Sequence, residues 1–173
     1  PLLLPACGGP LGMTSGNLSE EPIAAENQEA LDRLGRIADA FLLHDRDIHM
    51  RSDDSVVRVS LGRERLLRRA RGHAPLPVHL AAPVPPLLAV GAHLKNAVAV
   101  ARGRDVFLSQ HIGDLESHES QHAFTAVIAD LLSFYEVRPV AVAHDLHPDY
   151  AATQWARAFA AAAEPSPVLI AVQ

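Results

Sequence analysis

Apolar residues in the second half of the chain follow a period that changes along the sequence. Over residues 87–111 they form short runs separated by turn-forming residues, which predicts a meander of three strands at 87–92, 97–102 and 106–109. The first predicted turn contains Gly91, Lys95 and Asn96, and Gly103 begins the second. We expect the rest of the chain to be organised around this meander.

Residues 117–135 change to helical spacing. Apolar side chains recur on one face of this stretch, at Phe124, Val127, Ile128, Leu131, Leu132 and Tyr135. The spacing predicts an amphipathic helix, with Ser117 as its N-cap and Glu119 in its first turn.

The remaining segments complete a β-β-β-α-β-α-β order. A short apolar strand is predicted at 140–143, a helix at 150–163 with Asp149 as its cap, and a last strand at 168–172. Because crossover connections are right-handed, we expect the last two strands to lie parallel in one sheet that the helices cover. This α/β order resembles the first half of the actin, sugar-kinase and Hsp70 type of ATPase fold, which is ribonuclease H-like.

The first half of the chain predicts less regular structure. Its patterns indicate strands at 11–14, 40–43 and 55–59, and a helix at 28–34 with Asn27 as cap and Gly35 as its end. The proline-rich residues 72–86 predict a stiff linker. We therefore expect two domains, one over residues 1–71 and one over residues 87–173.

The composition is that of a globular protein. Hydrophobic residues make up 49% of the chain, and no apolar run approaches the ~20 residues that span a bilayer. A formal charge of −5 argues against a nucleic-acid binder. The single cysteine, Cys7, has no disulfide partner and favours a reducing cytoplasm. The chain starts at Pro1 and stops at Gln173 directly after an apolar strand, so we expect a fragment.

Two turns carry candidate phosphate chemistry. The turn with Gly91, Lys95 and Asn96 exposes backbone N–H groups and an ammonium at the strand ends, although an ordinary hairpin has the same composition. Ser15 and Asn17 flank a glycine in a second turn, where they either bond phosphate or carbonyl oxygens or simply bend the chain.

Charged clusters in the first half allow two further interpretations. Asp53 and Asp54 are potential metal ligands, but adjacent side chains on an extended backbone point to opposite faces. Five arginines form a local basic cluster that suits either solvent or a triphosphate: Arg63, Arg65, Arg68, Arg69 and Arg71.

Seven blocks of sequence, in order, resemble a known family. They are MTSGNLSEEPI, ADAFLLHDR, DDSVVRV, LLRRARGHAP, GAHLKN, LSQHIGDLE and AHDLHPDY. The blocks span nearly the whole chain and are similar to the hydrogenase-maturation carbamoyltransferases of the HypF type. The resemblance implies the C-terminal part of a YrdC-like domain, followed by the N-terminal part of the family's actin-like ATPase-type domain.

The resemblance also implies an activity and its partners. The family makes carbamoyl-adenylate from ATP and carbamoyl phosphate, and passes the carbamoyl group to the C-terminal cysteine of the HypE protein. Zinc or another divalent metal is expected in the full-length family, with its ligands outside this chain. Neither nucleic acid nor membrane is an expected partner.

Carried over position by position, the family implies several binding residues. Ser15 and Asn17 would contact the nucleotide or carbamoyl group. The residues that would hold phosphates are Ser55, Arg69 and Arg71, with Lys95 and Asn96 serving the second domain. Candidates for substrate binding or a second site lie at predicted strand ends, namely His111, Asp114, Asp145 and His147. No catalytic residue is identified.

The chain departs from the family at four positions. Asp47, His73, His93 and Ala97 stand where the family usually has Pro, Tyr, Glu and Thr. Two alternatives remain open: a threonylcarbamoyl-adenylate synthase of tRNA modification, and a non-catalytic module of two half domains. We expect the isolated 173-residue chain to be inactive, lacking ATP–pyrophosphate exchange driven by carbamoyl phosphate.

Overall fold

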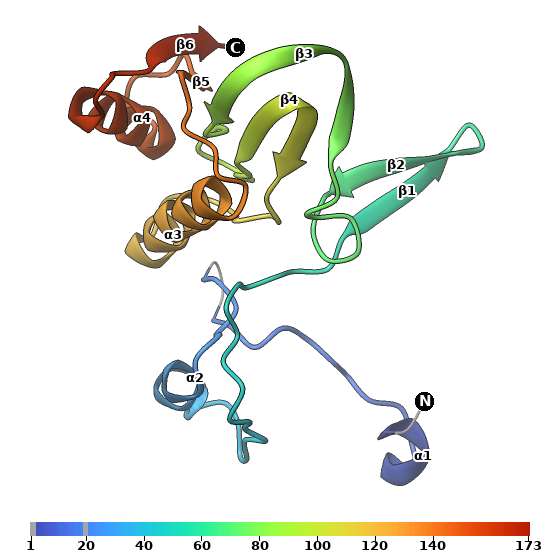
Figure 1. The fold of residues 1–173 in the computed structure, drawn as a ribbon. Coiled ribbons are helices and arrows are strands. Elements are labelled where there is room, and N and C mark those ends of the chain that lie inside the picture. Colours follow the sequence, from blue (N-terminus) through green and yellow to red (C-terminus); the bar gives the residue numbers. More distant parts are fainter. Residues whose placement is uncertain (1–2, 19–20) are drawn as a thin grey trace.

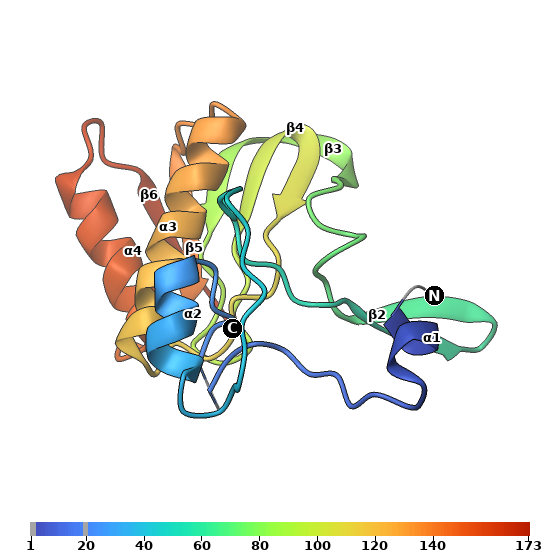
Figure 2. The same ribbon diagram turned by 90° about the horizontal axis from the view of Figure 1, so that it is seen from below.

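The computed structural model of the chain describes residues 3–18 and 21–173, and a mixed α/β unit dominates it (Figure 1). Four strands form one sheet in the order β4-β3-β5-β6, and two helices lie on the same side of that sheet (Figure 2). The bounds are β3 (Val78–Ala89), β4 (Ala99–Leu108), α3 (His118–Phe134), β5 (Ala141–Asp145), α4 (Ala151–Ala162) and β6 (Val168–Val172). The predicted α/β class is confirmed.

Strand directions in the sheet agree with the predicted crossovers. Strand β5 is parallel to β3, with Leu88 opposite Val142, and β6 is parallel to β5. Strand β4 is antiparallel to β3. The prediction that the last two strands lie parallel in one sheet is therefore confirmed.

The meander differs from the prediction in one respect. The second and third predicted strands belong to one element, β4, because Gly103 pairs with Val84 and Asp105 pairs with His79. The chain nevertheless reverses within β4, where Gly103 takes a φ of 64°. The reversal brings Ser109 back to Val98, whose carbonyl accepts the Ser109 N–H at 2.8 Å, and Figure 1 shows β4 as an arch.

Strand β3 begins earlier than predicted. It starts at Val78, within the proline-rich stretch predicted as linker. Its register against β4 shifts between His79 and Val84 and again before Leu87, and such irregular pairing tolerates prolines, which donate no backbone hydrogen bond.

The core lies between the sheet and the two helices. Leu88, Val100 and Val142 are fully buried there, and Phe124 of α3 meets Trp155 of α4 edge-on at 5.6 Å. Helix α3 has its predicted N-cap, since Ser117 accepts a hydrogen bond from the Ser120 N–H at 3.1 Å. The cap of α4 is Tyr150, one residue later than predicted.

The first half contributes short elements around this unit. They are α1 (Leu3–Cys7), α2 (Asn27–Leu34), β1 (Val56–Ser60) and β2 (Arg63–Arg68). Figure 1 shows β1 and β2 as a projecting hairpin and α1 apart from the rest. The cap of α2 is Glu26 instead of Asn27, and residues 11–14 and 40–43 are not strands.

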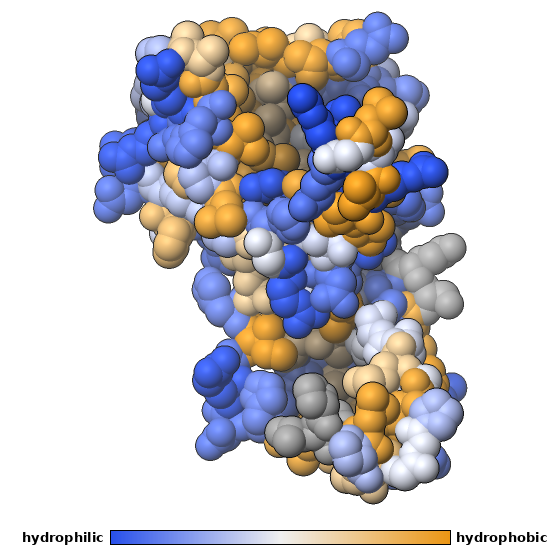
Figure 3. Space-filling view, turned by 90° about the vertical axis from the view of Figure 1, so that its right-hand side faces the viewer, coloured by the Kyte–Doolittle hydropathy of each residue, from blue (hydrophilic) through white to orange (hydrophobic). Residues whose placement is uncertain are grey.

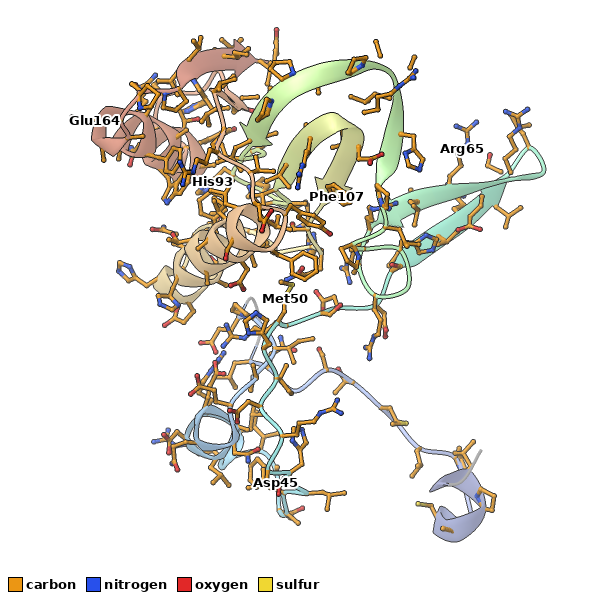
Figure 4. The ribbon with its side chains drawn as sticks, in the orientation of Figure 1. Asp45, Met50, Arg65, His93, Phe107 and Glu164 are labelled. Atoms are coloured by element: carbon orange, nitrogen blue, oxygen red, sulfur yellow. The ribbon has the colours of Figure 1, made fainter. Side chains whose placement is uncertain are left out.

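We call residues 13–18 and 21–54 the N-terminal arm. It meets the sheet unit along a seam, where His49 of the arm lies 3.6 Å from the Asp130 carboxylate of α3. Figure 4 shows Met50 of the arm below Phe107 of β4. In the described part of the chain, no helix is both long and apolar enough to cross a membrane.

Candidate functional site

A cleft of about 320 Å³ lies on the seam between the N-terminal arm and the loops at one end of the sheet. We call it the seam cleft. Its lining comes from both halves of the chain: Ser15, Asn17, Glu21, Pro22, Ile23, Asp53, Arg68, Lys95, His111, Ile112, Gly113, Asp114 and Ser120. Five of the residues predicted from the sequence to bind substrate or nucleotide therefore face one cavity.

The turn between β3 and β4 places Lys95 in this cleft. Gly91 has a φ of 67°, and a Cβ there would lie 2.5 Å from the Ala97 carbonyl oxygen, so the turn closes only on glycine. Asn96 is 1% exposed, and its Nδ2 donates to the carbonyls of Val90 at 2.9 Å and Ala92 at 2.6 Å. Asn96 thus holds the turn in shape from inside.

Asp114 balances the charge of Lys95. The backbone N–H of Lys95 donates to Asp114 Oδ1 at 2.7 Å, and its Nζ lies 2.9 Å from Oδ2. These two contacts, the backbone one first, hold the pKa of Asp114 below its usual range. The carboxylate therefore stands where an anionic ligand of Lys95 would bind.

His111 is the titratable group at the centre of the lining. Burial lowers its pKa, and the positive charges of Arg68 and Lys95 add to this effect, while Asp53 and Asp114 oppose it. The imidazole is consequently neutral at pH 7, with one nitrogen that donates and one that accepts.

Arg68 is a cleft residue that the sequence did not single out. It forms no salt bridge with the residues that the structure describes, and it lines both the seam cleft and an adjoining cavity with Arg69, Lys95 and His111. Its only signal in the sequence was membership of the basic cluster. Arg68 therefore adds a second positive charge to a lining that also contains the carboxylates of Glu21, Asp53 and Asp114.

The opposite wall is the turn of residues 15–17. Ser15 Oγ donates to Asn17 Oδ1 at 2.5 Å, and Asn17 Nδ2 donates to the carbonyls of Leu18 at 2.8 Å and Glu21 at 3.0 Å. The two predicted residues lie in the cleft lining, with their polar groups engaged in shaping the turn.

Ser55 and Arg71 lie outside the seam cleft. Ser55 Oγ donates to the Arg71 carbonyl at 2.9 Å, while the Arg71 guanidinium pairs with Asp54 at 2.9 Å. Arg69 donates to the carbonyls of His73 and Leu76 and lines only the adjoining cavity. Within the described residues, these groups fix the backbone between β2 and β3.

The two residues of the acidic pair share one cavity. Asp53 lines the seam cleft, and both Asp53 and Asp54 line a second cavity with Arg71. Among the described residues, no group of three or more His, Cys, Asp or Glu side chains has the geometry to hold a metal ion.

Asp145 and His147 lie apart from the seam cleft, in the loop after β5. Asp145 Oδ1 accepts the His147 N–H at 2.8 Å. The ring of Tyr150 stacks with His147 at 4.2 Å and with His93 at 5.2 Å. The structure thus divides the four second-site candidates, with His111 and Asp114 in the cleft and the other two in a separate aromatic cluster.

Comparisons with known proteins match both halves of the chain. A family model described as the HypF Kae1-like domain matches residues 82–173. A second model, covering Sua5, YciO and YrdC proteins and described as telomere recombination, matches residues 1–70.

Curated relatives match along most of the chain. Carbamoyltransferase HypF of Synechocystis sp. is 47% identical over 156 residues, which cover 90% of this chain and 20% of that protein. Carbamoyltransferase HypF of Rhizobium leguminosarum bv. viciae is 49% identical over 146 residues, with 84% and 19% covered. The chain thus spans about a fifth of the length of these relatives.

Solved structures agree in fold. A crystal structure of full-length HypF in the phosphate- and nucleotide-bound form superposes with a TM-score of 0.85 at 43% identity, covering 92% of this chain and 25% of that one. HypF of T. kodakarensis gives a TM-score of 0.83 at 38% identity, covering 93% and 21%.

Proposed function

The chain belongs to the HypF family, and from that membership we propose that it supplies a substrate-binding cleft to an ATP-dependent carbamoyltransferase of nickel–iron hydrogenase maturation. In the proposed cytoplasmic reaction, carbamoyl phosphate and ATP give carbamoyl-adenylate. The carbamoyl group then passes to the C-terminal cysteine of HypE. Residues 1–71 are assigned to a YrdC-like domain, and the sheet unit from the start of β3 at Val78 to residue 173 is assigned to the actin-like second domain.

The seam cleft is the observation that carries the proposal. It is lined by Lys95 and Arg68 and by the turn of Ser15 and Asn17. Phosphates need fixed cations, and these two side chains supply them. A solved relative that binds phosphate and nucleotide supports the same ligand class.

We expect the chain to contribute positioning and charge, because adenylation needs no covalent intermediate with the protein. Water first hydrolyses carbamoyl phosphate to carbamate and inorganic phosphate. A carbamate oxygen then attacks the α-phosphorus of ATP, and pyrophosphate leaves with the bonding electrons. Lys95 and Arg68 stabilise the negative charge that shifts between the phosphate oxygens. In the transfer step, the acceptor thiolate attacks the carbamoyl carbon and AMP leaves.

The metal expected in the family does not enter this scheme. The residues that the structure describes bring no three ligands together, so we derive no step through a metal ion. ATP is the only cofactor that the seam cleft itself supports.

The threonylcarbamoyl-adenylate synthase alternative is less well supported. The first-half match is common to both families, but the HypF Kae1-like model covers residues 82–173, which contain Lys95, His111 and Asp114 of the cleft. The proposal therefore depends on the second half of the chain.

ATP binding tests the proposal through the Lys95–Asp114 pair. Replacement Asp114→Asn removes the carboxylate that competes for the Lys95 ammonium, and we expect ATP affinity, measured by isothermal titration calorimetry, to rise about threefold to tenfold. Replacement Lys95→Gln should lower it by about tenfold or more.

Asp105→Asn is the matched control. Asp105 pairs with His79 at 2.6 Å on the sheet, outside the seam cleft, so its loss should leave ATP affinity unchanged. Equal ATP affinity in Lys95→Gln and the unmodified protein would exclude the seam cleft as the nucleotide site.

A further inference from the structure

The start of α3 carries two histidines that the seam cleft does not use. Residues 118–122 read His-Glu-Ser-Gln-His, and the side chains of His118 and His122 are both exposed. Neither imidazole forms a hydrogen bond or an ion pair with the residues that the structure describes. Both rings therefore keep a nitrogen lone pair available to a ligand.

The helix brings these two rings together. Residues i and i+4 are neighbours on a helix surface, with Cβ atoms about 5–6 Å apart. This is the spacing at which the His-Glu-x-x-His pattern on a helix holds a metal ion between two imidazoles. The first turn is held in helical geometry by its cap, because Ser117 accepts the Ser120 N–H at 3.1 Å.

The histidine pair faces away from the seam cleft. Ser120 stands between the two histidines in sequence, is 2% exposed and lines that cleft. At about 3.6 residues per turn, Ser120 lies on the opposite side of α3 from both His118 and His122. A metal ion on the pair would therefore not contact a ligand in the seam cleft.

The donor set restricts the kind of metal. Imidazole nitrogens favour late first-row cations such as Ni²⁺ and Cu²⁺, whereas Mg²⁺ and Ca²⁺ prefer oxygen ligands. Among the described residues, no third His, Cys, Asp or Glu side chain completes the site. A catalytic zinc centre takes three protein ligands, so the pattern does not make a metalloprotease here.

The charges around the pair are mixed. The N-terminus of a helix carries the positive end of its dipole, which opposes a bound cation. Glu116 and Glu119 are exposed in sequence on either side of His118 and offset that dipole with two negative charges. The pair therefore remains accessible to a cation.

We propose that His118 and His122 form a surface site for a late first-row transition-metal ion, Ni²⁺ or Cu²⁺, with solvent supplying the other ligands. The site goes beyond the proposed function, because it uses none of the residues that line the seam cleft.

The test titrates Ni²⁺, and separately Mg²⁺, into the longest natural polypeptide that contains this chain, by isothermal titration calorimetry. His118→Gln and His122→Gln each remove one imidazole from an exposed position, and thermal melting verifies that each variant is folded. Because two linked ligands bind one ion more tightly than either alone, each variant should lower the Ni²⁺ affinity of one site by about tenfold or more. Mg²⁺ binding should not change in either variant.

The matched control moves one imidazole along the helix. His122→Gln combined with Thr125→His keeps all ten histidines of the chain but places the second ring at an exposed position seven residues after His118. The two Cα atoms are then about 10.5 Å apart along the axis, too far to share one ion. This double variant should bind Ni²⁺ as weakly as His122→Gln alone.

The outcomes separate a built site from scattered surface histidines. Unchanged Ni²⁺ affinity in both single variants would overturn the proposal. Full affinity in the double variant would also overturn it, because the number of histidines would then matter and their spacing would not. ATP affinity should be the same in every variant, so a failure of the seam cleft as nucleotide site would leave the histidine site standing.

Discussion

At the residue scale, His111 is shared by three cavities. It lines the seam cleft, the cavity beside Gln110 and the cavity beside Arg69. A neutral imidazole there accepts or donates a hydrogen bond without adding charge to the cleft. Its charged neighbours come from four segments of the chain: Asp53 of the arm, Arg68 of β2, Lys95 of the turn before β4 and Asp114 of the loop after it.

The titration of His111 is a direct measure of this environment. Burial and the neighbouring Arg68 lower its pKa below 6.5, so the unfolded chain takes up the proton first and stability falls as pH drops through 6.5 towards the folded-state pKa. Arg68→Gln should raise the His111 pKa towards 6.5, as followed by imidazole NMR signals across a pH series.

Arg104→Gln provides the comparison for that experiment. Arg104 donates to the backbone carbonyls of Leu80 and Ala81 on the sheet, so its loss should leave the His111 titration in place. An unchanged titration in Arg68→Gln would show that burial alone sets the His111 pKa.

Which polar residues face the cleft was only partly predictable. Lys95 and Asn96 are neighbours in the same turn, yet the first is 75% exposed at its side chain and the second is buried. The difference arises because the Asn96 N–H donates to the carbonyl of the distant Gly113 at 2.8 Å. Local composition does not encode such a long-range contact.

At the element scale, a charged cluster around Glu29 holds α2 against the rest of the N-terminal arm. Arg33 and Arg51 both bond its carboxylate, Arg51 Nη2 at 2.8 Å, and Arg51 Nε also donates to the Ile23 carbonyl at 2.7 Å. Burial alone would raise the pKa of Glu29, but the Ala25 N–H and Arg51 outweigh it and lower that pKa to about 2.

The cluster predicts how the arm responds to acid. The stability that Glu29 contributes is complete above pH 4.5 and is lost as pH falls from 4.5 towards 2, because only the folded state resists protonation in that window. Glu29→Gln should lower the free energy of unfolding at pH 7 by about 2 kcal/mol and flatten its acid dependence, as measured by urea melts.

Glu164→Gln is the control for the acid experiment, since Glu164 is exposed after α4 (Figure 4). It should change the free energy of unfolding little. Retention of the steep loss between pH 4.5 and 2 in Glu29→Gln would assign that loss to other carboxylates.

Element types were more predictable than element ends. The helical period placed α3 and α4 correctly because a long apolar face can pack only one way against the sheet. The caps of α2 and α4 each moved by one residue, since a neighbouring side chain or backbone satisfied the end equally well. The chain reverses at 103–105 as the turn-forming residues indicate, but the continuity of β4 was missed because β3 stays paired with it through the reversal.

At the scale of the whole molecule, apolar surface remains open at the sheet edge. Strand β6 pairs only with β5, and its Val168 and Ile170 are 65% and 40% exposed. Figure 3 shows apolar residues on the surface towards both ends of the molecule, interspersed with hydrophilic ones. An unpaired apolar edge strand is a template for association.

We therefore expect the 173-residue chain to associate as its concentration rises, as measured by sedimentation velocity. Ile170→Lys should shift the population towards monomer, because a charge on the edge blocks pairing with another chain. Leu42→Lys, at a fully exposed loop position, should leave association unchanged. A monomer at all concentrations in the unmodified chain would contradict this expectation.

The topology of the sheet followed from the order of elements, but the seam did not. Crossover rules fix β5 and β6 once α3 and α4 are placed. The meeting of Asn17 with Lys95 depends instead on the path of the arm around α3, and irregular segments carry no periodicity from which to derive that path.

The lining of the seam cleft comes from residues far apart in the chain, with Ser15, Asn17 and Glu21 from the arm and Lys95 to Ser120 from the sheet unit. Each group also lines another cavity, but neither forms the seam cleft alone. A single proteolytic cut that frees the arm would therefore remove this cleft in one step and leave Lys95 and His111 in the other cavity that they share.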